Sequence, residues 1–409
     1  MKYYYLYYIN IYIQFIKYYQ MNLNYQERKH ILDQLQIDAL TINEEDITKY
    51  IDNQRESPPS SPSSSTLTQT TQPPIDLPFL NLKSLQQQPE STCSFYIDVQ
   101  NQLHWIRSPH SFYLTRKPND DYALQIFKNI LAQLKSLHLT VYTDPHDAEI
   151  FSLGVFNNQQ MVDLAIVIGG DGSVLHASSK FNFKPPPIAA VNGGSLGFLS
   201  VLGADNLIQK LLTGPLNLVR RRRLVVRHKQ HQFLSLNEIY IHRGFSAFLT
   251  NLLVFVNNRF IARIQADGLL ISTPTGSTAY ALSAGGVPVK SSVDCILLTP
   301  VCPHVMSSKQ LILSDQDVIT VKIDRNARAS GTASVDGRQN IEIAPGESIH
   351  IFMQKAEDSL FTICEVEESV DFFKSLRDGL NWNVRVTQKG FGSTESRTYD
   401  IGDVNSDCE

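Results

Sequence analysis

Between residues 111 and 199, short apolar runs alternate with a stretch whose apolar residues recur at helical spacing. The runs that read as strands are 111–117, 139–142, 162–168 and 187–192. Residues 121–137 carry apolar side chains three and four positions apart and predict a helix, and a second helix is expected after residue 170. This alternation predicts a doubly wound α/β domain, in which ligands bind beyond the carboxyl ends of the strands.

After about Asp205 the pattern changes to short strand-like runs separated by short turns. These runs are 224–226, 233–241, 251–256, 259–264, 295–299, 318–323, 332–335, 341–343 and 348–352. Asn257-Asn258 stands between two of them and is typical of a hairpin turn. An all-β second domain is therefore predicted, and a strand and a helix between residues 360 and 382 are expected to end the ordered chain.

The two ends of the chain differ in amino-acid composition from the two predicted domains. Residues 57–74 are rich in Ser, Thr, Pro and Gln and predict a flexible linker. The predicted division is a disordered, low-complexity region (1–92), an α/β domain (93–205), an all-β domain (206–356), a strand and a helix (357–387) and a disordered tail (388–409). The tyrosine-rich residues 1–20 are interrupted by polar side chains, which favours an upstream artefact or leader before Met21 over an interfacial anchor.

Composition narrows the class of protein. The chain has 409 residues and a net charge of −4, so it lacks the basicity typical of nucleic-acid binders. Its five cysteines are scattered and form no CxxC, which argues for a reducing compartment and against a disulfide framework or a zinc site. We expect a cytoplasmic protein with no nucleic-acid partner, no membrane partner and no metal held by its own side chains.

A glycine-rich turn follows the most apolar of the strands. Residues 169–173, Gly-Gly-Asp-Gly-Ser, are called the first glycine turn here. Its N–H groups and the start of the next helix attract anions such as phosphate. Asp171 repels an anion, so its presence favours a base for an attacking hydroxyl or a partner of magnesium. The structural alternative is an Asp that caps the following helix.

A second candidate region is the hydroxyl-rich segment, residues 267–286, in which small Ser and Thr residues are broken by Pro and Gly. Such a segment suits a polar ligand that lies along the backbone. The chain contains neither GxxxxGK[ST], nor GxGxxG after a strand, nor the HRD and DFG motifs of protein kinases. Phosphate chemistry is therefore expected at the first glycine turn. The later glycine turn, residues 193–199, is expected to line the same cleft.

Two basic features of the sequence can be interpreted without a functional role. The run Arg220–Arg223 is interpreted as a solvated lead-in to a strand, in preference to a phosphate-binding or nuclear-import patch. His176 lies one turn into the helix after Asp171, where a surface position is as reasonable as one facing the cleft.

The first glycine turn, Asn237-Glu238, Asp267-Gly268 and the sequence STPTGSTAY at 272–280 together resemble the NAD kinases over residues 111–382. Residues 298–304 and 381–385 look like the eukaryotic branch. The resemblance implies a phosphofructokinase-like α/β domain, a β-sandwich-like second domain, and a C-terminal strand and helix that return to the first domain.

The resemblance also implies an activity: transfer of the γ-phosphoryl group of ATP, with Mg²⁺, to the 2′-hydroxyl of the adenosine ribose of NAD, giving NADP. Asp171 matches the proton acceptor. The residues that match NAD-binding or phosphate-binding positions are Gly169, Gly170, Gly172, Ser173, Asn237, Glu238, Gln265, Asp267, Thr278, Ala279, Tyr280 and Ser283. Gln265 stands where some bacterial members have Arg, which leaves its contact open. Association into a homodimer or homotetramer through the β domain is expected.

Two other functions stay open at this point. A lipid or sugar kinase can share the GGDG turn, although it does not explain residues 273–283. A dinucleotide-binding regulator that has lost catalysis is the non-enzymatic alternative, against which the intact Asp171 argues. The sequence does not decide between NAD and NADH, or between ATP and polyphosphate.

Overall fold

The computed structural model describes residues 95–382 apart from 158–159, 183 and 195–196. The predictions for residues 1–92, including the linker at 57–74, and for the tail at 388–409 lie outside the described residues. Across the described part, none of the helices combines the length and apolar character that crossing a bilayer requires.

A nine-stranded sheet forms the first region, in the order β1-β2-β8-β21-β7-β6-β3-β4-β5. Its strands are β1 (Phe95–Ile97), β2 (Gln102–Trp105), β3 (Ser111–Arg116), β4 (Thr140–Thr143), β5 (Gly154–Val155), β6 (Leu164–Gly169), β7 (Ile188–Asn192), β8 (Leu216–Arg221) and β21 (Leu360–Ile363). Its helices are α4 (Asp121–Ser136), α5 (Pro145–Phe151), α6 (Asp171–Lys180) and α7 (Leu207–Thr213). The four predicted strands and both predicted helices are present.

Helices cover the sheet through two separate cores. Helix α4 starts at the cap Asp120, whose side chain accepts a hydrogen bond from the Ala123 amide at 3.0 Å. Its apolar stripe, including Phe127 and Ile130, joins one core with residues of β3 and β6, while Val174 of α6 joins the other core. The continuous apolar run of β6 is fully buried, as expected for a parallel strand between two such layers. The doubly wound α/β class is confirmed.

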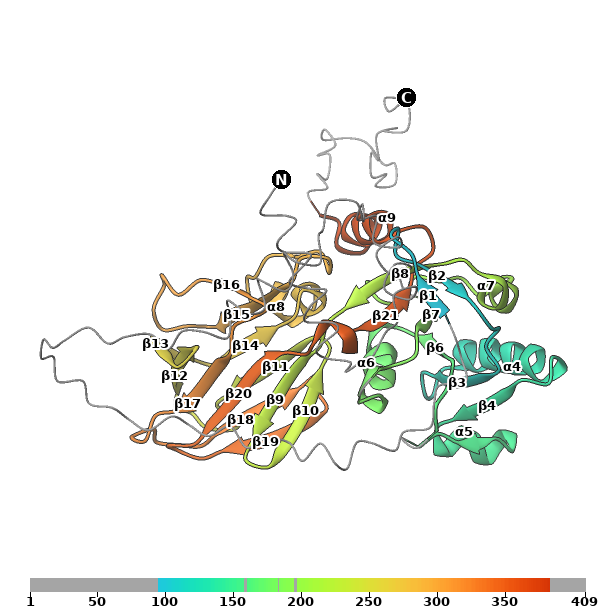
Figure 1. Ribbon diagram of the computed structural model, residues 1–409. Helices are drawn as coiled ribbons and strands as arrows, with labels where there is room; N and C mark the ends of the chain where they lie inside the picture. Colours follow the sequence, from blue (N-terminus) through green and yellow to red (C-terminus); the bar gives the residue numbers. More distant parts are fainter. Residues whose placement is uncertain (1–94, 158–159, 183, 195–196, 383–409) are drawn as a thin grey trace, which may run out of the picture. The chain divides into compact units, whose positions relative to one another are not determined.

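The C-terminal strand returns to this sheet. Strand β21, drawn in orange-red in Figure 1, pairs parallel with β7 and antiparallel with β8. Strand β8 also belongs to the sheet although it lies beyond residue 205, so the α/β region extends further along the chain than the expected boundary. Helix α9 (Glu368–Lys374) and the π-helical turn η5 (Ser375–Gly379) follow β21.

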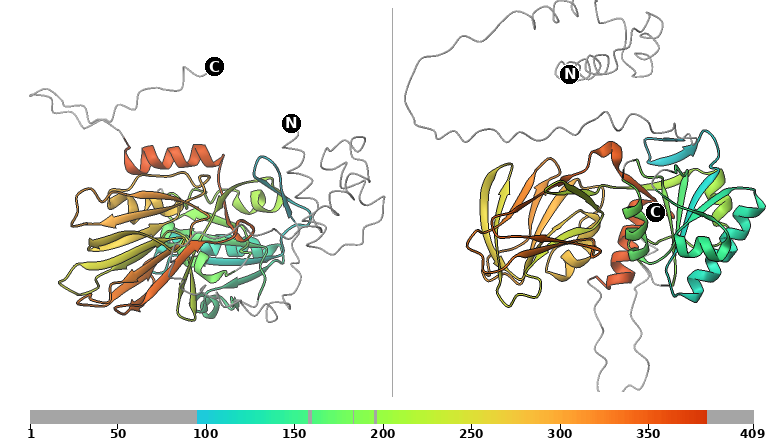
Figure 2. Two further views of the ribbon diagram at one scale, coloured as in Figure 1. Left: turned by 60° about the vertical axis from the view of Figure 1, so that its left-hand side comes forward. Right: turned by 90° about the horizontal axis from the view of Figure 1, so that it is seen from below.

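The second region is built from two six-stranded antiparallel sheets, ordered β10-β9-β20-β17-β12-β13 and β16-β15-β14-β11-β18-β19. Their strands are β9 (Leu224–His228), β10 (His231–Ser235), β11 (Glu238–His242), β12 (Thr250–Val256), β13 (Arg259–Ala266), β14 (Gly268–Ser272), β15 (Cys295–Val301), β16 (Leu311–Ser314), β17 (Ile319–Ile323), β18 (Gly331–Val335), β19 (Gln339–Ile343) and β20 (Ser348–Met353). Figure 2 shows these layers in the yellow-to-orange part of the chain. Alternate residues of both sheets share one apolar core, which makes a β-sandwich.

One turn prediction is confirmed, and one strand prediction is wrong. Asn257 and Asn258 have φ of 49° and 63°, the left-handed pair that a tight hairpin between β12 and β13 needs. The run 233–241, predicted as one strand, is two strands in different sheets: β10 ends at Ser235 and β11 begins at Glu238. The chain changes sheet at Leu236–Asn237, where the Asp336 side chain accepts both backbone N–H groups in place of a strand partner.

Candidate functional site

The first glycine turn connects β6 to α6 and needs glycine at its first position. Gly169 has φ of 146°, and a Cβ there would lie 2.4 Å from Ser173 Oγ. A Cβ at Gly170 or Gly172 would meet nothing within 4 Å, so the outer side of the turn is open. The turn therefore has a packed inner side and an accessible outer side, as a ligand-binding turn requires.

Asp171 is the first residue of α6, and its carboxylate is bound by another turn. Oδ2 accepts the Phe198 amide at 3.0 Å, and Oδ1 accepts the amides of Leu199 at 3.0 Å and Ser200 at 3.3 Å. The alternative that Asp171 caps its own helix is wrong, because Gly170 is the N-cap and no side-chain cap bond is made. A carboxylate has about four lone-pair sites. The Oδ2 atom, with one backbone donor, has room to accept a hydroxyl.

Gly197 allows this arrangement. A Cβ at Gly197 would lie 2.2 Å from Asp171 Oδ1, a distance that two non-bonded atoms do not adopt. Gly193 and Gly197 of the later glycine turn thus lie against the first one, as predicted, since β6 and β7 are adjacent parallel strands. A Cβ at Gly193 would also come within 3.0 Å of Gly169 Cα.

Asn237 and Glu238 lie where the chain enters β11. The backbone of Asn237 contacts the hydroxyl-rich segment, because its carbonyl accepts the Thr273 amide at 2.9 Å. Gly276 of that segment packs so closely that a Cβ would lie 2.2 Å from the Asn237 carbonyl oxygen. Two of the sequence motifs are therefore in direct contact.

Glu238 is a half-buried acid without a full set of partners. It stands opposite Ser272 in the β11–β14 pair, and among the described residues neither Glu238 Oε2 nor Ser272 Oγ has a hydrogen-bond partner. Burial, followed by the nearby charge of Asp336, raises the pKa of Glu238 to about 8. Buried polar atoms normally find partners, so this pair of orphan oxygens is suited to a polar ligand.

Asp267 directly precedes β14, and Tyr280 contacts Tyr240 of the neighbouring strand β11. Asp267 Oδ1 accepts Arg243 Nε at 2.8 Å. The Tyr280 ring meets the Tyr240 ring edge-on at 5.1 Å between centroids. Burial, together with Tyr280 and Asp267, raises the pKa of Tyr240.

Gln265 and Ser283 are both exposed. Gln265 lies on the edge strand β13, and its carbonyl accepts the His304 amide at 2.8 Å. Ser283 ends the short helix α8 (Tyr280–Ser283). Among the described residues, no hydrogen bond joins either side chain to another candidate residue, although Ser283 shares α8 with Tyr280.

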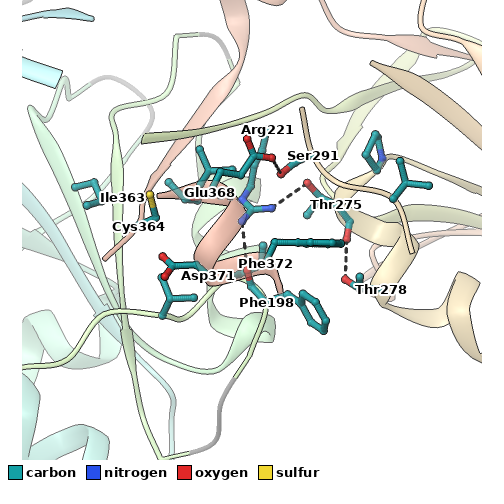
Figure 3. Close-up of a pocket in the computed structure, with 16 residues that line it drawn as sticks. Phe198, Arg221, Thr275, Thr278, Ser291, Ile363, Cys364, Glu368, Asp371 and Phe372 are labelled. Atoms are coloured by element: carbon teal, nitrogen blue, oxygen red, sulfur yellow. Dashed lines mark hydrogen bonds between the residues drawn. The ribbon is translucent and has the colours of Figure 1, made fainter. Parts of the chain in front are cut away.

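A small pocket, partly open to solvent, lies between the turn that binds Asp171 and the hydroxyl-rich segment. Figure 3 shows Phe198 of that turn, Thr275 and Thr278 of the segment, and Glu368 and Phe372 of α9 around it. Among the predicted site residues, Thr278 lines this pocket, whereas Asp171, Asn237, Glu238 and Asp267 do not.

Arg221 lines this pocket, and its contacts contradict the interpretation of Arg220–Arg223 as solvated. Its guanidinium donates to Thr362 Oγ1 at 2.8 Å. It also donates to Phe198 O at 3.2 Å and to Thr275 Oγ1 at 3.3 Å (Figure 3). Burial lowers its pKa to about 10, against the opposing charge of Asp171. Arg223 is fully buried, and only Arg220 is substantially exposed, so the run is not a solvated lead-in.

Sequence reasoning missed two residues of the turn between β18 and β19. Asp336 binds the backbone at Asn237 and Glu238, and Arg338 donates to Gly172 O at 2.6 Å. The signal was present, because Asp336-Gly337 stands between two predicted strands and has positive φ at both positions. Such a turn is common in hairpins, and nothing in its sequence says that its side chains reach other motifs.

The chain matches two family models. The ATP-NAD kinase N-terminal domain matches residues 115–217, and the ATP-NAD kinase C-terminal domain matches residues 236–362. A fission yeast protein (Schizosaccharomyces pombe) named as a mitochondrial NADH kinase is 32% identical over 308 residues, which are 71% of this chain and 79% of that protein. A rice protein (Oryza sativa subsp. japonica) named as probable NAD kinase 1 is 33% identical over 315 residues, 70% of this chain and 59% of its own length.

The fold has a match among solved structures. The crystal structure of yeast NADH kinase complexed with NADH aligns with a TM-score of 0.67 and 29% identity, covering 72% of this chain and 96% of that chain. The present chain spans 59% and 63% of the lengths of two rice relatives, and 32% of a third.

Proposed function

The chain belongs to the ATP-NAD kinase family, and we propose that it transfers the γ-phosphoryl group of ATP to the 2′-hydroxyl of the adenosine ribose of NAD, giving NADP. The observation that carries this proposal is the turn at residues 335–338, which contacts both the strand entry at Asn237–Glu238 and the first glycine turn. The pair expected to bind the dinucleotide and the carboxylate expected to receive the proton are thereby tied to one structural element.

Asp171 is suited to accept the proton of the ribose hydroxyl. Its carboxylate is fixed by three backbone N–H groups, and Oδ2 keeps room for one more donor. Phosphoryl transfer passes through a loose transition state, so correct placement of the hydroxyl contributes more than the strength of the base. A rigidly held acceptor fits this requirement.

NAD would be bound mainly by the β region. Glu238 and Ser272 offer two buried oxygens that need partners, which ribose hydroxyls supply. The proposed binding set, with Asp171 as the acceptor, is Gly169, Gly170, Gly172, Ser173, Asn237, Glu238, Gln265, Asp267, Thr278, Ala279, Tyr280 and Ser283.

Mg²⁺ would enter as part of the substrate MgATP. Among the described residues, no group of three His, Cys, Asp or Glu side chains is able to hold a metal ion. Mg²⁺ commonly keeps several waters and binds through substrate phosphates, so an ion carried by the phosphates of ATP needs no dedicated set of protein ligands. When bound, the ion would neutralise phosphate charge.

The C-terminal family model favours NAD over a lipid or a sugar as the acceptor, since it spans the strand entry and the hydroxyl-rich segment. ATP is favoured over polyphosphate as the donor by the ATP-NAD kinase description. Both NAD and NADH belong in the test, because similar proteins carry either name.

Two further properties form part of the proposal. A homodimer or homotetramer is supported by exposed apolar side chains of the β region, namely Phe245, Phe248, Leu249, Phe260 and Ile261. Sedimentation velocity tests it, and a monomer at micromolar concentration contradicts it. Cytoplasmic localisation is supported by the scattered cysteines. Similar proteins include mitochondrial and chloroplastic ones, so cell fractionation is the deciding measurement.

The activity is tested by incubating the full chain with MgATP and either NAD or NADH, and measuring NADP(H) with a dehydrogenase specific for the phosphorylated form. We expect product above a no-enzyme blank that increases linearly with protein concentration. Folded protein that forms no NADP(H) contradicts the proposal.

A further inference from the structure

The turn between β18 and β19, residues 335–338, holds the backbone at the start of β11. Asp336 Oδ2 accepts the Leu236 amide at 2.8 Å, and Oδ1 accepts the amides of Asn237 at 2.9 Å and Glu238 at 3.2 Å. Ser235 Oγ donates to the same carboxylate at 2.7 Å. Asp336 is half-buried, and four donors fix its carboxylate. The position of the Asn237–Glu238 pair is therefore set by this turn.

Arg338 extends from the same turn to the first turn of α6. Its Nη2 donates to Gly172 O at 2.6 Å, and its Nη1 donates to His176 Nδ1 at 3.2 Å. His176 Nε2 lies 3.3 Å from Asp144 Oδ2. Because Nδ1 accepts from a guanidinium, the proton of the neutral ring is on Nε2 and faces Asp144. The guanidinium thus holds α6 at Gly172, directly after Asp171, and at His176, one turn later.

Several arginines connect the α/β region to the β region, and Arg338 differs from Arg221 and Arg223 among them. Arg221 and Arg223 are buried and bind several carbonyl and hydroxyl groups, whereas Arg338 is exposed. Loss of the Arg338 side chain would leave Arg221 and Arg223 in place. Its removal is therefore expected to alter the alignment of α6 without unfolding the chain.

We propose that Arg338 is a positioning residue that sets Asp171 against the ribose bound by the β region. This inference rests on the proposed function. The acceptor is bound by β11, β14 and the hydroxyl-rich segment, while the carboxylate belongs to α6, so the two must be held in register. A displacement of about 1 Å in such an arrangement costs on the order of 100-fold in rate.

The test compares Arg338→Met with Arg338→Lys and with the matched control Arg328→Met. Arg328 is a cation of the β region that lies over the Phe248 ring at 4.8 Å, so its loss changes net charge equally without affecting Gly172. We expect Arg338→Met to reduce kcat by about 10- to 100-fold, with the KM for NAD and the KM for ATP changed less than about 2-fold. Arg338→Lys should recover part of kcat, and Arg328→Met should match the parent chain.

A second measurement does not depend on activity. Hydrogen exchange of the amides in the first turns of α6, residues 173–176, should be faster in Arg338→Met than in Arg328→Met, with Tm within a few degrees of the parent. Unchanged kcat or unchanged exchange overturns the proposal. A raised KM for ATP with kcat retained also overturns it, because Arg338 would then be a ligand of the donor.

The two measurements also separate this inference from the proposed function. If the parent chain forms no NADP(H), the proposed function fails, and the exchange result still decides whether Arg338 orders α6. If the parent is active and Arg338→Met equals it, only the positioning role fails.

Discussion

Glu238 gives the sharpest prediction, because its environment favours the neutral acid. The pKa is raised from 4.5 to about 8, first by burial and then by the charge of Asp336. The folded state therefore binds a proton that the unfolded chain releases above its own pKa. Stability is full below pH 4.5 and falls as the pH rises from 4.5 to about 8. At about 1.4 kcal/mol per pH unit, the loss is about 3 kcal/mol at pH 7 and approaches about 5 kcal/mol above pH 8.5.

Glu238→Gln removes this proton linkage while keeping the shape of the side chain. We expect the free energy of unfolding of the variant, relative to the parent, to rise by about 4 kcal/mol between pH 5 and pH 8.5. Urea unfolding of the ligand-free chain, followed by circular dichroism at both pH values, measures the difference. The exposed Glu342, replaced in the same way, should show no such pH dependence. A Glu238→Gln difference that is equal at both pH values refutes the reasoning.

Two further substitutions test the packing of the site. Gly197→Ala places a Cβ 2.2 Å from Asp171 Oδ1 and should lower kcat by about 100-fold, whereas Gly203→Ala, with nothing within 4 Å, should not. Steady-state NADP formation measures both, and equal rates would contradict the role given to Gly197. Arg223→Met should destabilise the chain by about 3 kcal/mol, because it leaves oxygens of Gln354, Phe181 and Asn182 without their hydrogen-bond donor. Thermal unfolding beside the exposed Arg259→Met measures this, and equal Tm values contradict it.

The elements of the α/β region were predictable because their physical signals are local. The run at β6 is apolar throughout since both faces are buried, and α4 shows its stripe at helical spacing. Asn257-Asn258 also carries its own signal, because few residues adopt two successive positive φ values. The first glycine turn and the hydroxyl-rich segment were likewise singled out from their residue types, whereas Asn237-Glu238 and Asp267 were singled out through the resemblance to a family.

The long-range features were not predictable from the chain alone. The break between β10 and β11 depends on Asp336, about 100 residues later, whose carboxylate accepts the backbone N–H groups there. Arg221 and Arg223 were predicted to be solvated because runs of charged residues usually are. Their burial is stabilised by carbonyl and hydroxyl groups from distant segments. The bond from Arg338 to Gly172 spans 166 positions of sequence.

The central claim is that Asp171 accepts the proton of the NAD ribose hydroxyl during phosphoryl transfer. The most direct measurement is single-turnover NADP formation by Asp171→Asn, with saturating MgATP and enzyme in excess over NAD, alongside the Kd for NAD. The account predicts a rate at least about 100-fold below the parent with the Kd changed less than a few fold, since Asn keeps the shape but not the basicity. A near-parental rate contradicts it.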